Sequence, residues 1–320
     1  MNIWREIKKP IKVLAPMAGY TDSAFRQLCR ACGADLVMTE LVSADAIYHK
    51  SKYWYKEDGM WLSRKGFDET LEMLQFAEAE RPIIVQLFGK YPEKFAFAAD
   101  WLTKNLQPDG IDINMGCPAR KVVNSDHGAA LLKNPELAAE IVRAVKSNTT
   151  LPVSVKTRLG WDNINQILEF APVLVTAGID ALTVHARTYK MGFSGTPEWS
   201  NIYEVKKMFG DDLVVIGNGG IKNTLDLETR ISDLDGVAIG QAAIGAPWIF
   251  SDHIPSKEEI KTTALKHASF AFEAKGEKGM LEYRKHLLHY LRRLEAPKAL
   301  RLQAVEVMTL EQVQTIFSHI

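Results

Sequence analysis

The chain has 320 residues, of which 47% are hydrophobic and 24% are charged. These proportions are typical of a globular protein and exclude intrinsic disorder and collagen. The 39 basic residues balance the 39 acidic ones, so the total charge argues against a highly basic nucleic-acid binder. No apolar run approaches the roughly 18 residues of a membrane helix, and residues 1–10 lack the apolar core of a signal peptide. We therefore expect a cytoplasmic protein without a membrane partner.

The cysteines indicate neither a disulfide framework nor a metal site. There are three, Cys29, Cys32 and Cys117, which is an odd number and far too few for a disulfide scaffold, so reduced thiols are expected. Cys29 and Cys32 have Cys-x-x-Cys spacing, but they fall on an amphipathic helix with no second pair of ligands nearby. We expect no bound metal.

Eight short apolar runs, each followed by a segment of helical length, fill the chain up to residue 240. Their apolar residues are continuous and not alternating, which fits parallel strands covered on both faces. Eight such units in about 250 residues predict an α/β fold of the (β/α)8 barrel (TIM barrel) type. A doubly wound sheet is the alternative, but the first strand runs into Ala15-Pro16-Met17-Ala18-Gly19 and not into a Gly-x-Gly-x-x-Gly turn. The predicted strands are residues 12–15, 35–41, 82–88, 110–114, 152–157, 180–185, 212–217 and 235–240.

After residue 250 the strand pattern stops. Residues 257–320 read as helical, with turn signals near Gly276, Gly279 and Pro297, so we expect a barrel domain over residues 1–250 and a small all-α domain over 251–320. Between residues 284 and 301 one acid, Glu295, stands against six basic residues, Arg284, Lys285, Arg292, Arg293, Lys298 and Arg301. This local excess is either a solvated helix face or a surface for an anionic partner.

Six of the eight predicted strands end in polar residues, and in a barrel these ends meet at one rim, where active sites lie. The polar ends are Glu40, Gln86, Asn114, Lys156 with Arg158, His185 with Arg187, and Asn218. The last two rims, residues 216–221 and 239–245, are rich in glycine, which lets backbone N–H groups and following helix N-termini approach a phosphate. The second has Walker spacing but lacks the Lys-Ser or Lys-Thr that completes a nucleoside triphosphate site.

Two rim residues carry reactive groups. Cys117 lies in a Gly-Cys-Pro loop just past the fourth strand, where rigid backbone would place its thiol at the mouth as a nucleophile or a proton donor. Lys156 could form a Schiff base or hold an anionic ring or phosphate.

In their order along the chain, these segments resemble the tRNA-dihydrouridine synthases, flavoenzymes that reduce uridine in tRNA. The Asn-Met-Gly-Cys-Pro and Lys-Thr-Arg blocks are the most specific, and a weaker similarity runs from residue 284 to 301. The matching segments are Leu14-Ala15-Pro16-Met17-Ala18-Gly19-Tyr20-Thr21-Asp22, Gln86-Leu87-Phe88-Gly89, Asp112-Ile113-Asn114-Met115-Gly116-Cys117-Pro118, Gly128-Ala129-Ala130-Leu131-Leu132, Lys156-Thr157-Arg158-Leu159-Gly160-Trp161, His185-Ala186-Arg187-Thr188, Asn218-Gly219 and Pro247-Trp248-Ile249-Phe250.

The resemblance implies a tRNA-modifying oxidoreductase that contains FMN and is re-reduced by NADPH or NADH. Hydride would pass from reduced flavin N5 to C6 of uracil, and Cys117 would protonate C5. Asn114 and Arg158 would orient the base, with Arg187 beside them, and a monomer would bind tRNA through Arg284, Lys285, Arg292 and Arg293. The FMN contacts implied are Pro16, Met17, Ala18, Gln86, Lys156, His185, Asn218, Gly219, Gly220, Gly240 and Gln241.

Three positions depart from that family's pattern. Gly220 stands where Asp usually follows Asn-Gly, Gln241 where Arg commonly follows Gly, and Tyr189 where a second Arg often follows Arg-Thr. Other readings of the same residues are a flavin-dependent barrel reductase acting on a small molecule, a Schiff-base lyase built on Lys156, and an RNA-binding protein with a degenerate barrel.

Overall fold

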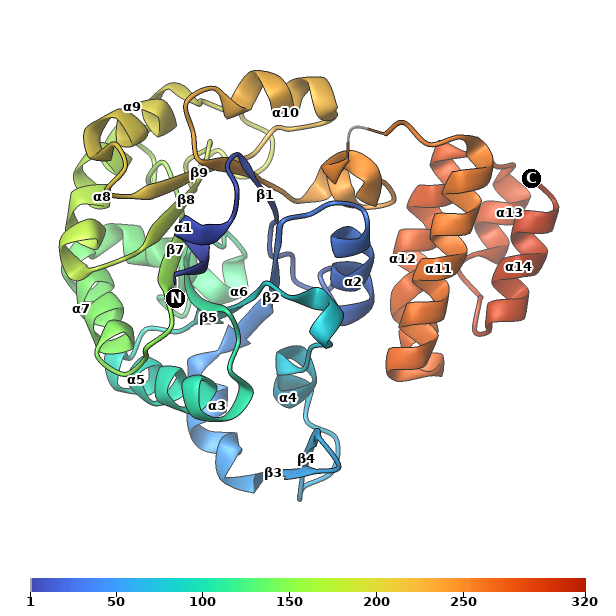
Figure 1. Cartoon of the computed structure of the whole chain (residues 1–320), viewed down its shortest axis with the longest axis horizontal. Coiled ribbons are helices and arrows are strands. Elements are labelled where there is room, and N and C mark those ends of the chain that lie inside the picture. The colour runs from blue at the N-terminus through green and yellow to red at the C-terminus, as the bar shows by residue number, and fades with distance from the viewer. Residues whose placement is uncertain (1, 252) are drawn as a thin grey trace.

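The computed structural model describes residues 2–251 and 253–320, and its larger part is a closed barrel of eight parallel strands (Figure 1). The strand order around the barrel is β1-β10-β9-β8-β7-β6-β5-β2. The closed order confirms the (β/α)8 prediction and rules out an open doubly wound sheet. All eight predicted strands are present, as β1 (Ile11–Leu14), β2 (Leu36–Ser43), β5 (Ile83–Phe88), β6 (Gly110–Met115), β7 (Val153–Arg158), β8 (Ala181–His185), β9 (Val214–Asn218) and β10 (Gly236–Ile239).

Helices surround the barrel, and several begin at a side-chain cap that the sequence supplies. Asp22 accepts a hydrogen bond from the backbone N–H of Phe25, and Asn134 from that of Leu137, each at a helix start. No described helix combines the length and the apolar character needed to cross a bilayer. Besides the short α1 (Ile3–Glu6) before β1, the helices of this part are α2 (Ser23–Ala31), α3 (Ala44–Lys50), α4 (Glu69–Leu74), α5 (Pro92–Trp101), α6 (Arg120–Val123), α7 (Pro135–Lys146), α8 (Gln166–Ala177), α9 (Ser200–Phe209) and α10 (Thr224–Ile231).

A short antiparallel hairpin that the sequence reading did not predict interrupts the connection from β2 to β5. Its strands, β3 (Trp54–Glu57) and β4 (Met60–Ser63), are joined by Asp58 and Gly59, both with positive φ. An Asp-Gly pair between two strands is a strong hairpin signal, so the sequence did contain the information.

The barrel interior has an apolar floor and a polar mouth. Because side chains alternate along a strand, every second residue points inward. At the N-terminal ends of the strands, Ile11, Leu36 and Ile84 pack with Trp4 of α1 (Ile3–Glu6), which is fully buried. Toward the C-terminal ends the inward side chains become polar, and these form the site described below.

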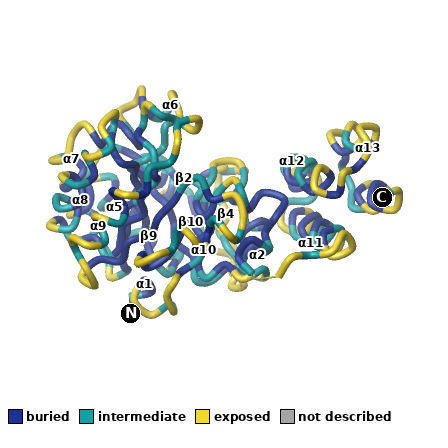
Figure 2. Tube along the Cα trace, turned by 90° about the horizontal axis from the view of Figure 1, so that it is seen from above, coloured by how far each residue is buried: buried dark blue, intermediate teal, exposed yellow. Residues whose placement is uncertain are grey.

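The C-terminal helices form a compact group on one side of the barrel, next to α2 (Figure 1). Tyr283 and Leu287 lie in their shared apolar core, to which α2 contributes Ala24 and Leu28 (Figure 2 shows this core as buried residues between the helices). The predicted helical region is therefore confirmed, while the division into two functional domains stays a prediction. The four helices are α11 (Lys257–Lys275), α12 (Glu277–Arg293), α13 (Lys298–Gln303) and α14 (Leu310–Ser318).

One predicted turn in this region is wrong. Gly279 lies inside α12 and not at a turn, which falls at Gly276. A Cβ at position 279 would lie 1.9 Å from the carbonyl oxygen of Ala271 on α11. The glycine is needed because two helix backbones approach each other closely there, and not because the chain turns.

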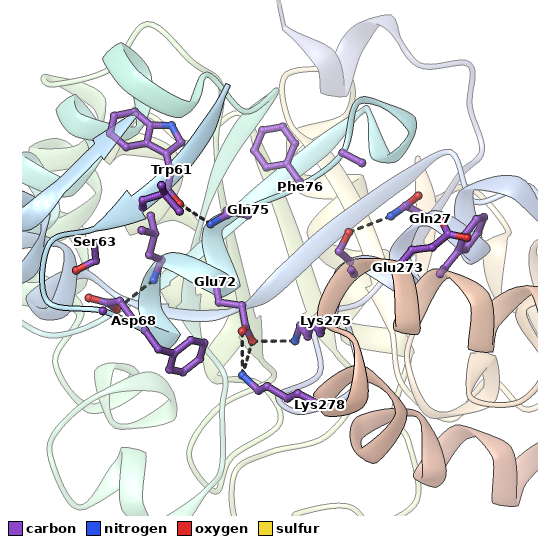
Figure 3. Close-up of a pocket in the computed structure, with 18 residues that line it drawn as sticks. Gln27, Trp61, Ser63, Asp68, Glu72, Gln75, Phe76, Glu273, Lys275 and Lys278 are labelled. Atoms are coloured by element: carbon purple, nitrogen blue, oxygen red, sulfur yellow. Dashed lines mark hydrogen bonds and ion pairs between the residues drawn. The ribbon is translucent and has the colours of Figure 1, made fainter. Parts of the chain in front are cut away.

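Charged side chains join α4, which precedes β5, to the C-terminal helices. The carboxylate of Glu72 lies 2.9 Å from Nζ of Lys275 and 2.8 Å from Nζ of Lys278 (Figure 3). A cavity of about 670 Å³ lies at this junction, with aromatic side chains from both parts in its wall, among them Trp61 and Phe270. Burial opposes ionisation of Glu72, but hydrogen bonds from the two lysines lower its pKa.

Candidate active site

Lys156 and Asn218 form the centre of the polar mouth. Lys156 Nζ on β7 donates to Asn218 Oδ1 on β9 at 3.0 Å, and Asn218 Nδ2 donates to the carbonyl of Ala238 at 2.6 Å, which fixes the orientation of the amide. Burial, and then the charge of Arg158, lowers the pKa of Lys156 to about 8. An ammonium has three hydrogens, so Lys156 keeps donors for an anionic or carbonyl-bearing group at the mouth.

His185, the last residue of β8, carries an unsatisfied polar atom. Within the part of the chain that the structure describes, its Nδ1 is buried and has no hydrogen-bond partner. Burial and then the charges of Lys156, Arg158 and Arg187 hold the pKa of His185 well below its usual value, so the ring is neutral. A Cβ at Gly219, where φ is +105°, would lie 3.0 Å from His185 Nε2. The glycine keeps the space beside the ring clear.

Cys117 is held at the mouth by the side chain of Asn114. Asn114 Oδ1 accepts from the backbone N–H groups of Gly116 at 3.2 Å and Cys117 at 3.0 Å, while its Nδ2 donates to Gln86 Oε1 at 2.9 Å. A Cβ at Gly128 would lie 3.0 Å from the carbonyl oxygen of Cys117, so the next segment packs closely on this loop. The thiol is half-buried on a restrained turn, and not in the core.

Arg158 ties the Cys117 loop to the loop after β8. Its Nε donates to the carbonyl of Gly116 at 2.8 Å, and its Nη1 donates to the carbonyls of Thr188 and Gly192 at 3.1 and 3.0 Å. The neighbouring Arg187 donates through Nε to the carbonyl of Gly195 in the same loop. Both guanidiniums therefore organise the rim.

The glycine-rich rims after β9 and β10 differ from the prediction in one respect. Two short 3-10 elements follow β10, Gln241–Ala243 and Pro247–Phe250, and α10 begins at Thr224, beyond the turn at Gly220. The expected helix dipole is thus missing at the β10 rim, and an anion would depend on backbone N–H groups. Gly240 lies against the mouth loop after β1, because a Cβ there would be 3.2 Å from the sulfur of Met17.

Pro16, Met17 and Ala18 form the turn that follows β1. Met17 is half-buried and its carbonyl accepts from the backbone N–H groups of Tyr20 and Thr21. Glu40 of β2 accepts from the backbone N–H of Gly19. Glu40 was expected at the rim as a polar strand end, and in the structure its carboxylate holds this turn through the hydrogen bond from Gly19.

The structure separates the four basic residues proposed for tRNA binding. Lys285 Nζ lies 5.2 Å from the centre of the Tyr20 ring, and so at the mouth. Arg292 and Arg293 are exposed on the same helix. Arg284, in contrast, donates through Nε to the carbonyl of Val307 at 2.7 Å and through Nη2 to Met308 Sδ at 2.8 Å. Its guanidinium is engaged inside the helical region, so it is a structural residue here, unlike the other three.

The departures at Gly220 and Tyr189 have structural explanations. A Cβ at Gly220, where φ is +78°, would lie 2.4 Å from Cγ of Pro197, so no side chain fits. Tyr189 stacks on Trp161, with ring centres 3.9 Å apart and planes 18° apart, and Lys133 Nζ lies 4.1 Å from the centre of the Trp161 ring. Gln241 is exposed, and nothing in the structure explains that departure.

The sequence reading missed two inward-facing residues below the site, Asp112 and Ser154. Each lies two residues before a residue that was selected, Asn114 or Lys156, and so faces the same interior. That spacing is the signal that could have found them.

Comparison with known proteins identifies the family. The family model for dihydrouridine synthase matches residues 13–319. A probable tRNA-dihydrouridine synthase of Aquifex aeolicus is 35% identical over 308 residues, covering 94% of this chain and 87% of the relative. The tRNA-dihydrouridine synthase B of Pseudomonas aeruginosa is 36% identical over 306 residues (91% and 86%), and that of Pseudomonas putida is 37% identical over 298 (87% and 82%). With this match over nearly its whole length, and with the motifs of the resemblance gathered at one barrel mouth, the chain belongs to the dihydrouridine synthase family of enzymes.

Proposed function

We propose that this protein reduces specific uridines of tRNA to 5,6-dihydrouridine, using FMN as the cofactor and NADPH or NADH as the reductant. One observation carries the proposal: a thiol, a half-buried lysine of lowered pKa and a neutral histidine lie together at the mouth of one barrel, on Cys117, Lys156 and His185. The family's relatives are named for this reaction.

The donor set fits a flavin mononucleotide. His185 Nδ1 is a buried polar atom that needs a partner, and the backbone of Gly219 packs closely on the ring because the glycine lacks a Cβ. Lys156 offers an ammonium to a carbonyl or anionic position of a ring, and backbone N–H groups of the last two rims suit a phosphate. The residues proposed to hold the cofactor are Pro16, Met17, Ala18, Gln86, Lys156, His185, Asn218, Gly219, Gly220, Gly240 and Gln241.

When bound and reduced, the flavin would supply hydride to C6 of the uracil ring. Cys117 then gives the proton at C5, and its position on the turn held by Asn114 keeps the thiol at the mouth. Asn114 has a second amide hydrogen for the base, and Arg158 and Arg187 border the same opening. These residues orient the uracil and keep the loops closed around it.

A uridine must leave its stack to reach the mouth, so the RNA needs further contacts outside it. Three cations on α12 form a row: Lys285 lies beside Tyr20 at the mouth, and Arg292 and Arg293 are exposed further along the helix. Such a surface would recognise folded tRNA by its shape and phosphates.

The test uses the purified full-length protein. We expect flavin absorbance in the protein as isolated, and dihydrouridine, measured by mass spectrometry, in a tRNA incubated with the protein and NADPH. Free uridine serves as the comparison substrate, because a small-molecule reductase would act on it without tRNA. Mapping dihydrouridine in tRNA from cells that lack the protein would then locate the modified position. A protein without flavin absorbance that leaves tRNA unchanged would refute the proposal.

A further inference from the structure

A chain of hydrogen bonds leads from the barrel interior to the loop of Cys117. Asp112, which is fully buried, accepts from Ser154 Oγ at 2.6 Å and from Gln86 Nε2 at 2.7 Å. Gln86 Oε1 accepts from Asn114 Nδ2 at 2.9 Å, and Asn114 Oδ1 accepts from the backbone N–H of Cys117. These hydrogen bonds thus connect three neighbouring strands, β5, β6 and β7.

The two amides in this chain each have a donor end and an acceptor end, so their orientations depend on each other. At the mouth, two backbone N–H groups require the oxygen of Asn114, which turns its nitrogen toward Gln86. Gln86 must then present its oxygen to Asn114 and its nitrogen to Asp112. An ionised carboxylate accepts hydrogen bonds and cannot donate them, so it permits only this arrangement.

We propose that Asp112 is a positioning residue for the reaction, whose carboxylate acts through Gln86 and Asn114 to hold the loop of Cys117 in its reactive conformation. Reversal of the two amides would turn the nitrogen of Asn114 toward the N–H groups of Gly116 and Cys117, donor against donor, and the loop would move. The inference rests on the proposed function in taking Cys117 as the proton donor.

Opposing effects act on the ionisation of Asp112, and its carboxylate carries the negative charge mainly above about pH 7. Burial raises its pKa to about 7, against the hydrogen bonds from Ser154 and Gln86 and the charge of Lys156, which lower it. The charge of Lys156, on β7, acts on Asp112, whereas Ser154 and Gln86, which donate hydrogen bonds to its carboxylate, are neutral.

The first test needs no cofactor. In flavin-free protein, the rate of alkylation of Cys117 by iodoacetamide is followed by peptide mass spectrometry, which separates it from Cys29 and Cys32. Asp112→Asn is nearly isosteric, but its amide can face Gln86 with either end, so the orientation is no longer fixed. We expect alkylation of Cys117 to be about five- to tenfold faster, because the hydrogen bonds from Gly116 and Cys117 to Asn114 no longer restrain the loop of Cys117. The reaction is run at about pH 8.5, where Asp112 is ionised, and there Ser154→Ala removes a hydrogen bond from the same carboxylate without reversing the amides and should alkylate at the wild-type rate.

The second test is rescue. Combining Asp112→Asn with Gln86→Glu exchanges the carboxylate and the amide between these two positions. The new amide at position 112 can donate to the carboxylate at position 86, and the nitrogen of Asn114 can donate to the same carboxylate from the other side. The double variant should return the alkylation rate to within about twofold of wild type, since each hydrogen bond of the chain can form again. Wild-type alkylation in Asp112→Asn, or no return in the double variant, would overturn the inference, and thermal melting shows that each variant is folded.

An activity readout separates this inference from the proposed function. In flavin-loaded Asp112→Asn we expect the kcat for tRNA to fall about 10- to 100-fold, as for a misplaced reacting group, while the rate of flavin reduction by NADPH falls much less, because the thiol takes no part in that step. If both half-reactions fell equally, the role of Asp112 would be merely structural. If the wild type makes no dihydrouridine, the proposed function fails, whereas the alkylation series still decides whether Asp112 positions the loop.

Discussion

Lys156 and Asn218 lie on β7 and β9, which are not neighbours in the barrel, yet Lys156 Nζ donates to Asn218 Oδ1 at 3.0 Å. The contact passes the intervening β8, because in a closed barrel the inward side chains of alternate strands share one layer. It places a cation in the middle of the mouth, where an anionic or carbonyl group of a ligand would meet it.

The lowered pKa of Lys156 predicts how FMN affinity changes with pH. Lys156 loses its charge as the pH rises through about 8, so affinity should fall above that value, by about 10- to 100-fold once the cation is gone. A bound anion favours the charged amine, so the midpoint should lie above 8. Fluorescence titration of flavin-free protein between pH 7 and 9.5 measures the change. Lys156→Met should bind FMN weakly at every pH in this range; a variant that still showed the wild-type pH dependence would assign the effect to another group.

Replacement of Cys117 should stop tRNA reduction without affecting the flavin. Cys117→Ala removes the proton donor, so dihydrouridine formation should fall by about 10²- to 10⁴-fold, the usual contribution of a general acid. Stopped-flow absorbance should show unchanged reduction of the flavin by NADPH. Cys32→Ala, at the residue that follows α2, is the matched control and should retain full activity. Undiminished product from Cys117→Ala would remove the thiol from the mechanism.

The basic residues of α12 should contribute to tRNA binding in a salt-dependent way. Lys285→Ala and Arg292→Ala should each weaken binding and lower the slope of log K against log salt by about 1, as for the loss of one phosphate contact. Filter binding at several salt concentrations measures both quantities. Lys207→Ala is the control, because Lys207 is exposed on α9, across the barrel from the C-terminal helices (Figure 1). Equal effects at all three positions would mean that the charge acts generally and not through a surface on α12.

Arg284 should matter for stability and not for direct RNA contact. Arg284→Ala leaves the carbonyl of the buried Val307 without its donor, so the free energy of unfolding should fall by about 1–3 kcal/mol. Replacement of the exposed Arg292 by Ala should lower the free energy of unfolding by less than about 0.5 kcal/mol. Urea denaturation of both variants makes the comparison. Equal stability of the two would show that the hydrogen bonds of Arg284 are not needed.

Replacement of Gly220 by Asp, the residue expected there from the family's pattern, should destabilise this protein. In Gly220→Asp the new Cβ meets Pro197 at 2.4 Å, in addition to the strain of a positive φ, which costs about 1–3 kcal/mol. Gly210→Asp is the control, because Gly210 also has a positive φ but has nothing within 4 Å of its Cβ position. Calorimetry should show a larger loss at 220 than at 210, and adding Pro197→Ala should recover part of it. Equal losses would mean that the loop of Pro197 yields freely.

The sequence by itself determined the barrel and the residues of its rim. Continuous apolar runs specify strands covered on both faces, and the carboxyl ends of parallel strands must meet at one edge, so Gln86, Asn114, Lys156, His185 and Asn218 were found without coordinates. The helical region was predictable too, apart from Gly279, because helical periodicity is local while the close approach of α11 to α12 is not.

Only the tertiary structure decided which polar residues work together and which cations are free. A run of basic residues gives no sign that Arg284 is engaged by Val307 while Lys285 reaches the mouth at Tyr20, because both contacts join segments that are distant along the chain. In the same way, composition shows an aspartate at 112, but its partners Gln86 and Ser154 come from the neighbouring strands. Local periodicity tells which way a side chain faces; the closure of the barrel decides what it meets there.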